Sequence, residues 1–168
     1  GNNDFVKTNF SPFNTNNTKY GFTLIGCVVE ASNCRYCVHD EHTTNSEPYV
    51  NKYIDCEFKI DNTHNTPWGL HQCIGGGLGV SGIIKIENCI FNVVGANKNI
   101  YAVSYHNCSL ANAKSFISIT GCLFEHYNGI GFTEYGASTL VSKMIVSNNA
   151  FKDENPFIEE IKGNTNNI

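Results

Sequence analysis

The sequence predicts an all-β fold, a right-handed single-stranded parallel β-helix, or solenoid, of about five coils. Three observations lead to this prediction. A motif of two short strands around a one-residue bend occurs five times, its copies lie about 30 residues apart, and a third apolar stretch separates consecutive copies. Repeats of this length are typical of solenoids and related arrays, in which each repeat supplies one coil.

The repeated motif begins with a strand, bends at one residue and continues as a second strand. Its pattern is apolar, any, apolar, any, then Gly, Asp or Asn, then Cys, any, apolar. Each half alternates with a period of two, which indicates a strand with one buried face. The bend residues tolerate left-handed backbone angles, so we expect a positive φ at Asp55 and Asn88. The five copies are residues 22–29, 51–58, 84–91, 117–124 and 144–151.

The slot after each bend predicts a ladder of cysteines. It falls at positions 27, 56, 89, 122 and 149, separated by 29, 33, 33 and 27 residues, and the last position holds Asn149. Because neighbouring strands lie about 4.8 Å apart, we expect buried free thiols in vertical register. Only Cys34 and Cys37 form the close pair that zinc sites need, so we expect no metal and no cofactor. The ladder residues are Cys27, Cys56, Cys89 and Cys122, and Phe58, Phe91, Phe124 and Phe151 are expected to form a second ladder.

A third strand is expected in each coil, in the apolar stretch between motifs. A β-sandwich of unrelated strands is disfavoured, because it would not repeat one bend five times. Only residues 157–161 have a pattern compatible with a helix. The stretches expected to form third strands are 36–38, 72–74, 101–103 and 129–132.

The chain is expected to form one domain, since 168 residues suffice for a single core. Residues 1–20 would be an entry segment or first partial coil, residues 21–152 the regular coils and residues 153–168 a C-terminal tail. The chain starts at Gly1 without a methionine or a signal-peptide leader. We therefore expect a fragment of a longer protein.

Composition and charge exclude two classes of partner. The net charge is −4 and Arg35 is the only arginine, so no basic surface is expected to bind nucleic acid. No apolar run approaches the roughly 20 residues of a membrane span, so no membrane insertion is expected. Charged residues make up 15 % of the chain, and Asn, Thr and Gly are frequent instead. Such a surface suits contact with sugars or with other proteins.

The local sequences around the repeats resemble the pectate-lyase-like β-helix superfamily, and more narrowly the β-helix regions of bacteriophage tail and neck-appendage proteins. The resemblance covers about residues 20–152. It implies a virion or extracellular protein that binds or degrades host surface polysaccharide, often as a homotrimer or beside neighbouring domains of a longer chain. Buried free cysteines are compatible with a virion protein that folds in a reducing cytoplasm. The matching segments are Asn-Cys-x-Phe at residues 88–91, Tyr-Cys-Val-His-Asp-Glu at 36–41 and Cys-Ile-Gly-Gly-Gly at 73–77.

The catalytic motifs of the resembling enzymes are missing from this sequence. The Asn-Thr-Asp, paired-Asp, Gly-His-Gly and Arg-x-Lys motifs of polygalacturonase-like chains do not occur, and residues 61–63 read Asp-Asn-Thr, in the wrong order. Pectate lyases need arginine together with clustered aspartates, and Arg35 is the only arginine here. The departure leaves enzymatic activity open, as either polysaccharide hydrolysis or lysis.

Polar residues follow the third stretch of each coil, and stacking would bring them to one flank. Glycines at 75–77 would leave a gap between the coils of Asp40 and Tyr105. We expect this gap to be a groove that binds carbohydrate through ring contacts and hydroxyl hydrogen bonds. The candidate ligand-binding residues are His39, Glu41, His42, Trp68, His71, Gly75, Gly76, Gly77, Tyr105 and Tyr135, and the candidate catalytic residues are Asp40, His106 and Glu134.

The same residues also have a structural interpretation, because solenoid turns are polar and the three glycines can serve simply to turn the chain. Trp68 is equally suited to be a sugar platform or a loop anchor. If the groove exists, Gly76→Leu abolishes glycan binding with little loss of stability. If Tyr105 and His106 pack inside the coils instead, the groove is absent.

Three functions are therefore compatible with the sequence. The first is a phage tail-appendage-like module that binds or degrades host polysaccharide. The second is a structural β-helix shaft without a ligand, and the third is a free-standing bacterial polysaccharide lyase or hydrolase. A pair of carboxylates about 5–9 Å apart across the groove would favour hydrolysis. The candidate pairs are Asp40 with Glu41 or with Glu134.

Overall fold

The structure is a computed structural model that describes residues 13–14, 21–32, 36–42, 47–61, 71–78, 81–94, 100–106, 115–125, 130–133, 143–152 and 158–161. Within these ranges the regular structure is β-strand, and the strands pair in parallel. The expected all-β class is confirmed. The strands form three sheets, and neighbours within each sheet are three strands apart in sequence.

Each sheet collects every third strand of the chain. Sheet A contains β1 (Phe13–Asn14), β4 (Tyr36–His39), β7 (His71–Gly77), β10 (Ile100–His106), β13 (Ile130–Thr133) and β16 (Ile158–Ile161). Sheet B contains β2 (Gly21–Ile25), β5 (Tyr49–Ile54), β8 (Gly82–Glu87), β11 (Phe116–Thr120) and β14 (Lys143–Ser147). Sheet C contains β3 (Val28–Ser32), β6 (Glu57–Asp61), β9 (Ile90–Val94), β12 (Leu123–Glu125) and β15 (Ala150–Phe151).

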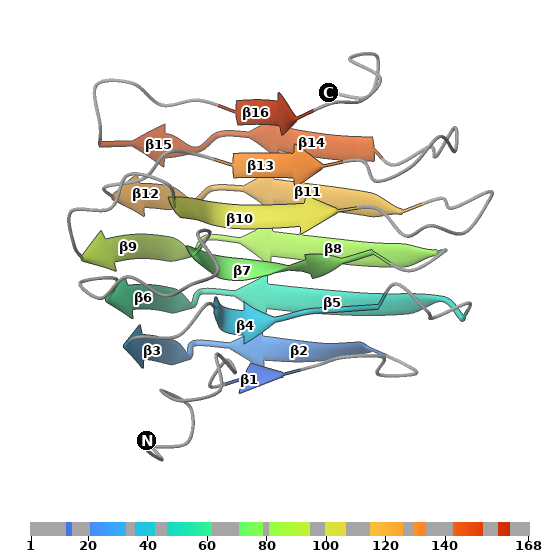
Figure 1. Cartoon of the computed structure of the whole chain (residues 1–168), viewed down its shortest axis with the longest axis horizontal. Helices are drawn as coiled ribbons and strands as arrows, with labels where there is room; N and C mark the ends of the chain where they lie inside the picture. The colour runs from blue at the N-terminus through green and yellow to red at the C-terminus, as the bar shows by residue number, and fades with distance from the viewer. Residues whose placement is uncertain are drawn as a thin grey trace.

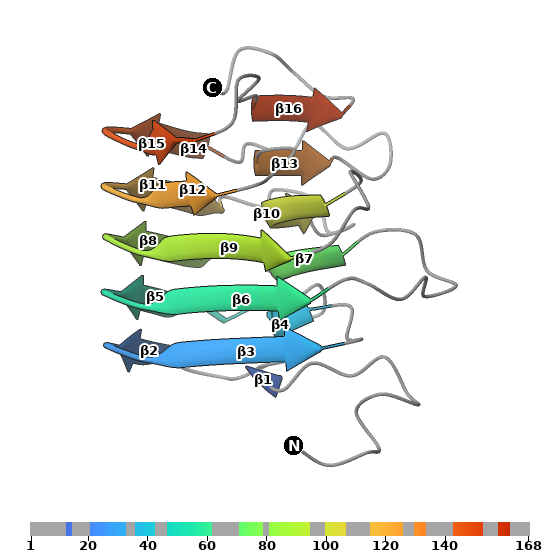
Figure 2. The same ribbon diagram turned by 90° about the vertical axis from the view of Figure 1, so that its left-hand side faces the viewer.

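Consecutive triplets of strands lie one above the next (Figure 1). We call β2–β3–β4 layer 1, β5–β6–β7 layer 2, β8–β9–β10 layer 3, β11–β12–β13 layer 4 and β14–β15–β16 layer 5. Figure 2 shows that each strand of sheet B continues at the same level into a strand of sheet C. The expected third strands are confirmed as strands of sheet A, whereas residues 158–161, for which a helix was possible, form strand β16.

The bends between sheets B and C adopt the expected backbone geometry. The φ angle is +52° at Asp55, +53° at Asn88 and +56° at Asn148, and the two glycine bends have +62° at Gly26 and +67° at Gly121. Asp and Asn accept this region more readily than other non-glycine residues. The prediction of positive φ at Asp55 and Asn88 is confirmed.

The expected ladders run through the core in register. The rings of Phe58, Phe91, Phe124 and Phe151 stack with successive centroid distances of 5.4, 5.0 and 4.8 Å. Cys56, Cys89 and Cys122 are buried, and the six cysteines in the described ranges are free thiols. Cys27 was expected to be buried as well, but it is only partly buried. The reason is its position in β2–β3, the last strands of sheets B and C in the described stack.

The thiols of the cysteine ladder also satisfy backbone groups at the bends. Each of the four donates to the carbonyl oxygen two residues before it, at 3.5 Å for Cys27, 3.2 Å for Cys56, 3.3 Å for Cys89 and 3.4 Å for Cys122. A hydrogen bond to Cys122 together with burial raises the pKa of Cys89 far above its usual range. In the fifth slot, Asn149 accepts from the Cys122 amide at 2.8 Å and donates to the Ile119 carbonyl at 3.0 Å. Cysteine therefore serves both as a small apolar residue and as a weak donor.

The outer faces of sheets B and C carry polar side chains together with the exposed apolar residues Ile25, Val28, Ile90 and Ile145. Along sheet C, Lys59 donates to Glu30 at 3.2 Å and Asn92 donates to Glu125 at 3.4 Å. The described ranges contain no helix of the length and apolarity that crossing a membrane requires.

Candidate functional site

The predicted site lies at the carboxyl ends of the strands of sheet A. There the backbone pairing between layers 1 and 2 continues past the last residue of β4. The amide of Asp40 donates to the Gly75 carbonyl at 2.8 Å, and the amide of His42 donates to the Gly77 carbonyl at 2.7 Å. Because side chains alternate along an extended chain, Asp40 and His42 point inward while Glu41 between them and His39 before them point outward. Asp40 and His42 are 0 % and 1 % exposed.

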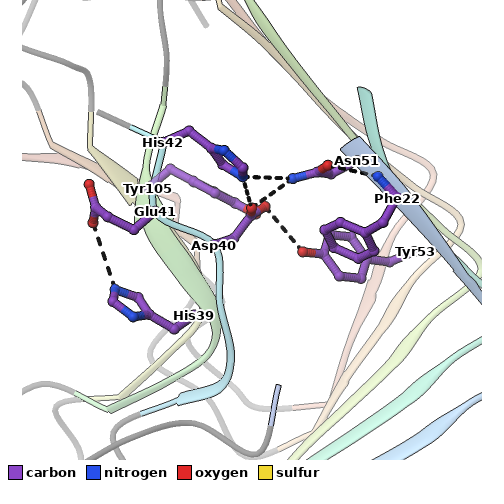
Figure 3. Close-up of polar contacts among 8 residues, drawn as sticks. All are labelled: Phe22, His39, Asp40, Glu41, His42, Asn51, Tyr53 and Tyr105. Carbon is purple, nitrogen blue, oxygen red and sulfur yellow. Dashed lines mark hydrogen bonds and ion pairs between the residues drawn. The ribbon is translucent and has the colours of Figure 1, made fainter. Parts of the chain in front are cut away.

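Asp40 is the centre of a buried hydrogen-bond network (Figure 3). Its Oδ1 is 2.6 Å from His42 Nε2 and accepts from Asn51 Nδ2 at 2.6 Å. Its Oδ2 accepts from the Tyr53 hydroxyl at 3.1 Å and from the Tyr105 hydroxyl at 2.8 Å. An ionised carboxylate accepts from four donors at once, whereas a protonated one would have to donate. The geometry therefore supports a buried negative charge surrounded by donors.

His42 completes one side of this network. A carboxylate oxygen only accepts, so the hydrogen between the two residues belongs to His42 Nε2. The His42 ring also stacks on the Tyr49 ring, with centroids 4.1 Å apart. Its Nδ1 is buried without a hydrogen-bond partner. In the neutral ring this atom is a lone pair, and leaving it unpaired is less costly than burying an unpaired N–H.

Asn51 is oriented by a backbone group of the layer below. The Phe22 amide donates to Asn51 Oδ1 at 3.2 Å, so the amide nitrogen of Asn51 faces Asp40 (Figure 3). The same nitrogen lies 3.1 Å from His42 Nε2. One side chain thus links the backbone of sheet B in layer 1 to the carboxylate at the end of sheet A.

The two tyrosine hydroxyls are neutral donors. Burial raises the pKa of Tyr53 and of Tyr105 well above the usual value, and the negative charge of Asp40 raises both further. Both phenols therefore keep their protons across the physiological range and beyond it. In that state each donates to the carboxylate, which disperses its negative charge.

Gly76 gives Tyr105 its path to Asp40. In sheet A, Gly76 is the register partner of Tyr105, and the next position below it is Asp40. With no side chain at Gly76, the Tyr105 ring from layer 3 reaches a carboxylate in layer 1. A Cβ at Gly76 would lie 2.2 Å from the Asp40 carbonyl oxygen, and its φ of +154° also favours glycine. The gap expected at the glycines thus lies on the inner face and is filled.

The outward residues of this segment are His39 and Glu41. His39 Nε2 lies 3.7 Å from Glu41 Oε2, and their side chains are 25 % and 23 % exposed. The His39 ring stacks on the Tyr36 ring with centroids 4.5 Å apart. This pair is a single imidazole–carboxylate contact, and it lies on the opposite side of the strand from the Asp40 network (Figure 3).

The expectation of an open groove is wrong for the side chains that the structure describes. Asp40, His42 and Tyr105 do come together with the three glycines, but inside the molecule, where Gly75, Gly76 and Gly77 are buried as well. Alternation along the extended chain, which places every second residue inside, is the physical reason. Asp40 therefore faces four protein donors rather than solvent, and it points to the opposite side of the strand from Glu41, one of its two proposed partners for hydrolysis (Figure 3).

The remaining candidates are only partly described. Trp68, Glu134 and Tyr135 lie outside the described residues. His71 and His106 lie in β7 and β10, and the structure describes only their backbone. The ligand-binding roles predicted for Trp68, His71 and Tyr135 and the catalytic roles predicted for His106 and Glu134 stay predictions.

Two members of the network were missed in the sequence, Asn51 and Tyr53. A signal for Asn51 was present, because it occupies the first apolar position of the repeated motif, where the other copies have Phe22, Ile84, Ile117 and Met144. A polar residue in an apolar slot predicts a buried polar partner. Tyr53 gave no such signal, since its ring fits an apolar slot and only its hydroxyl joins the network.

The described side chains offer no metal-binding cluster, since no group of three His, Cys, Asp or Glu residues among them is arranged to hold an ion. In the Asp40 network, the three polar atoms of Asp40, His42 and Asn51 are 2.6 to 3.1 Å apart. His42 Nε2 and Asn51 Nδ2 both donate to Asp40 Oδ1, and the arrangement satisfies a buried carboxylate. In the comparisons with known proteins, no family model matches this chain, and no curated protein or solved structure matches it either.

Proposed function

We propose that this chain is a segment of a right-handed parallel β-helix that serves as a rigid shaft, in an assembly of the phage tail-appendage type. The strand order supports the solenoid, because every sheet collects strands three apart, as a chain winding through three faces requires. The proposed partners are other protein segments of the appendage, including further copies of the chain, and the proposed location is the virion.

One observation carries the choice of a shaft over a polysaccharide enzyme or binder. The most chemically capable side chains of the predicted site, Asp40, His42 and Tyr105, are buried and hydrogen-bonded to each other. A ligand site needs such groups on a concave exposed surface. Here they stabilise the interior, and a rigid shaft requires such a stabilised interior.

Removal of one layer tests the shaft. Deleting residues 122–148 takes out β12, β13 and β14 and joins Gly121 to Asn149, so that β15 follows β11 and faces β9. The Asp40 network in layers 1 to 3 is untouched. We expect a variant that unfolds cooperatively and is shorter along the stack by about 4.8 Å, one inter-strand distance, in small-angle X-ray scattering.

A deletion that ignores the layers is the matched control. Removing residues 116–125 takes out β11 and β12 but leaves β13, so that two strands of sheet A follow each other. This variant should fail to fold, as judged by circular dichroism and urea unfolding. If the full-layer deletion is equally unfolded, the chain does not behave as a stack of exchangeable layers, and the shaft is rejected.

Carbohydrate binding is the second candidate, and it rests on the partly exposed pair His39 and Glu41 beside the glycine backbone. A glycan array with the intact chain separates the two functions. The shaft predicts no binding. Specific binding that is lost in a His39→Ala, Glu41→Ala variant of unchanged stability would favour the glycan module instead.

A further inference from the structure

The ladders of the core are nearly identical from layer to layer. Cys56, Cys89 and Cys122 follow one another in one column, and Phe58, Phe91 and Phe124 follow one another in another. Suppose that pairing slips by a whole layer, with one layer looped out or supplied by a second copy. Cysteine would still face cysteine, and phenylalanine would still face phenylalanine. The ladders therefore stabilise stacking but discriminate weakly between registers.

The members of the Asp40 network are the exceptions to this repetition. Asn51 has the apolar register partners Phe22 and Ile84 in sheet B. In sheet A, a glycine separates Asp40 from Tyr105. Each of these residues occurs in one layer alone within its described column.

The network also draws on three layers at once. Layer 1 supplies Asp40 and His42, layer 2 supplies Asn51 and Tyr53, and layer 3 supplies Tyr105. The Asp40 carboxylate has all of these donors only when the three layers are stacked in their native order. A buried carboxylate without its donors is far more costly than a mismatched apolar contact.

We propose that the Asp40 network is a register lock, which makes the native order of layers 1, 2 and 3 the one order that satisfies the buried carboxylate. If β4 paired with β10 instead of β7, Tyr105 would take the place of Gly76 beside Asp40, and its hydroxyl would no longer approach the carboxylate from two layers away. Asn51 and Tyr53 would leave Asp40 together with layer 2. This role follows from the strand order and does not depend on the shaft function.

An apolar replacement of the whole network tests the lock. The variant combines Asp40→Leu, His42→Phe, Asn51→Ile, Tyr53→Phe and Tyr105→Phe. These changes keep the approximate side-chain shapes, and of the donors in the network only the half-buried Phe22 amide loses its acceptor, Asn51 Oδ1. Replacing buried polar groups by apolar residues of similar volume is often neutral or stabilising. We expect the variant to stay folded and to lose the single register.

Cross-linking of two lysines reports the register directly. Lys52 and Lys85 are register partners on the outer face of sheet B, and a slip by one layer would place Lys52 opposite Ser118 instead. With an amine-reactive cross-linker on a mixture of ¹⁴N- and ¹⁵N-labelled chains, the native protein should give the Lys52–Lys85 link within one chain. In the apolar variant, links between chains should rise about tenfold or more, since one buried hydrogen bond to a charged group discriminates by that order.

Two further variants complete the test. The double variant Tyr53→Phe, Tyr105→Phe keeps the carboxylate and the fold, and should show a smaller rise in links between chains, even if the full variant does not fold. Phe91→Leu and Ile119→Val together weaken the core outside the network, and should show no rise at matched stability. If the folded apolar variant keeps the single link within one chain and one set of amide resonances, the ladders set the register and the lock is rejected. An unchanged link pattern in the double tyrosine variant would overturn it as well.

Discussion

The phenylalanine and cysteine ladders and the Asp40 network share one core, but they are built in opposite ways. In the ladders, each contact joins one layer to the next and repeats the contact below it, as in the ring stack from Phe58 to Phe151. The network joins residues as far apart as Asp40 and Tyr105, which lie 65 positions apart in the sequence, and none of its contacts is repeated. The repeated ladders bury apolar surface with the same residue types in every layer. The residues of the Asp40 network, in contrast, make one layer different from the next.

The two regions should also respond differently to substitution. A ladder residue loses part of its packing when it is shortened, and its neighbours relax into the space. A network residue leaves several buried partners unsatisfied at once, and these cannot reach water. The following predictions test this difference, from the largest expected effect to the smallest.

Asp40→Ala should be the most destabilising single change. It leaves two tyrosine hydroxyls, an amide and an imidazole N–H without their acceptor, and loss of one partner of a buried charged group costs about 3–5 kcal/mol. The measurement is the free energy of unfolding in urea. Glu30→Ala is the control, because Glu30 is an exposed partner of Lys59 with a side chain 66 % exposed, and such pairs contribute about 1 kcal/mol or less. Similar losses in the free energy of unfolding for both variants would mean that the Asp40 network contributes no more to stability than an exposed ion pair.

Gly76→Ala should cost about 3 kcal/mol, because strain at the backbone adds to a clash with Asp40. The added Cβ would meet the Asp40 carbonyl oxygen at 2.2 Å. This expectation replaces the mild effect that an exposed groove would give. Gly26→Asn is the matched control, since Gly26 has no atom within 4 Å of a Cβ and its bend conformation is the one that Asp55 and Asn88 adopt. The measurement is the thermal unfolding midpoint of both variants. A Gly76→Ala protein as stable as the control would contradict the packing of Asp40 against this strand.

Alkaline pH should weaken the Asp40 network through its two tyrosines. The pKa values of Tyr53 and Tyr105 are raised by burial, so the native state keeps both phenolic protons at a pH where unfolded tyrosines lose theirs, above about 10. The unfolded state then binds fewer protons, and the free energy of unfolding falls as pH rises. The slope is up to about 1.4 kcal/mol per pH unit for each tyrosine. The double variant Tyr53→Phe, Tyr105→Phe should have a shallower slope between pH 10 and 11, and an unchanged slope would assign the effect elsewhere.

Asn88→Val, at a bend beside the ladders, should cost about 1–2 kcal/mol, because a β-branched residue resists the positive φ of +53° found there. Asn88→Gly should be nearly neutral, since glycine adopts this region freely. Urea unfolding of the two variants separates backbone strain from side-chain effects. Equal losses would show that the Asn88 side chain, and not its backbone angle, stabilises the bend.

The bends and ladders were predictable because their information is local. At Asp55 and Asn88, a polar residue between two alternating segments specifies the bend within a few residues. The ladders then follow from the repeat period, because residues in equal slots meet once the strands pair in register. The partial exposure of Cys27 was not predictable from the slot, because it depends on which strands lie next to β2 and β3.

The composition of the candidate site was predictable in part, but its side of the strand was not. The sequence placed Asp40, Tyr105 and the glycines in neighbouring positions, and the sheet A register agrees. Whether they line a groove or fill the interior depends on which alternate side chains of the extended segment after β4 point inward. The sequence does not show which set points inward, because the inward residues Asp40 and His42 are both polar and no apolar alternation marks them.

The sequence by itself determined the all-β class, the five repeats and the position of each bend, because period-two alternation and left-handed bend residues act over a few neighbours. Only the tertiary structure decided that Asp40 is a buried hub. That outcome requires the absence of a side chain at Gly76, a hydroxyl from Tyr105 two layers away and an amide from Asn51 in another sheet. A buried carboxylate depends on donors that meet it only after the chain has folded, and no local pattern records that meeting.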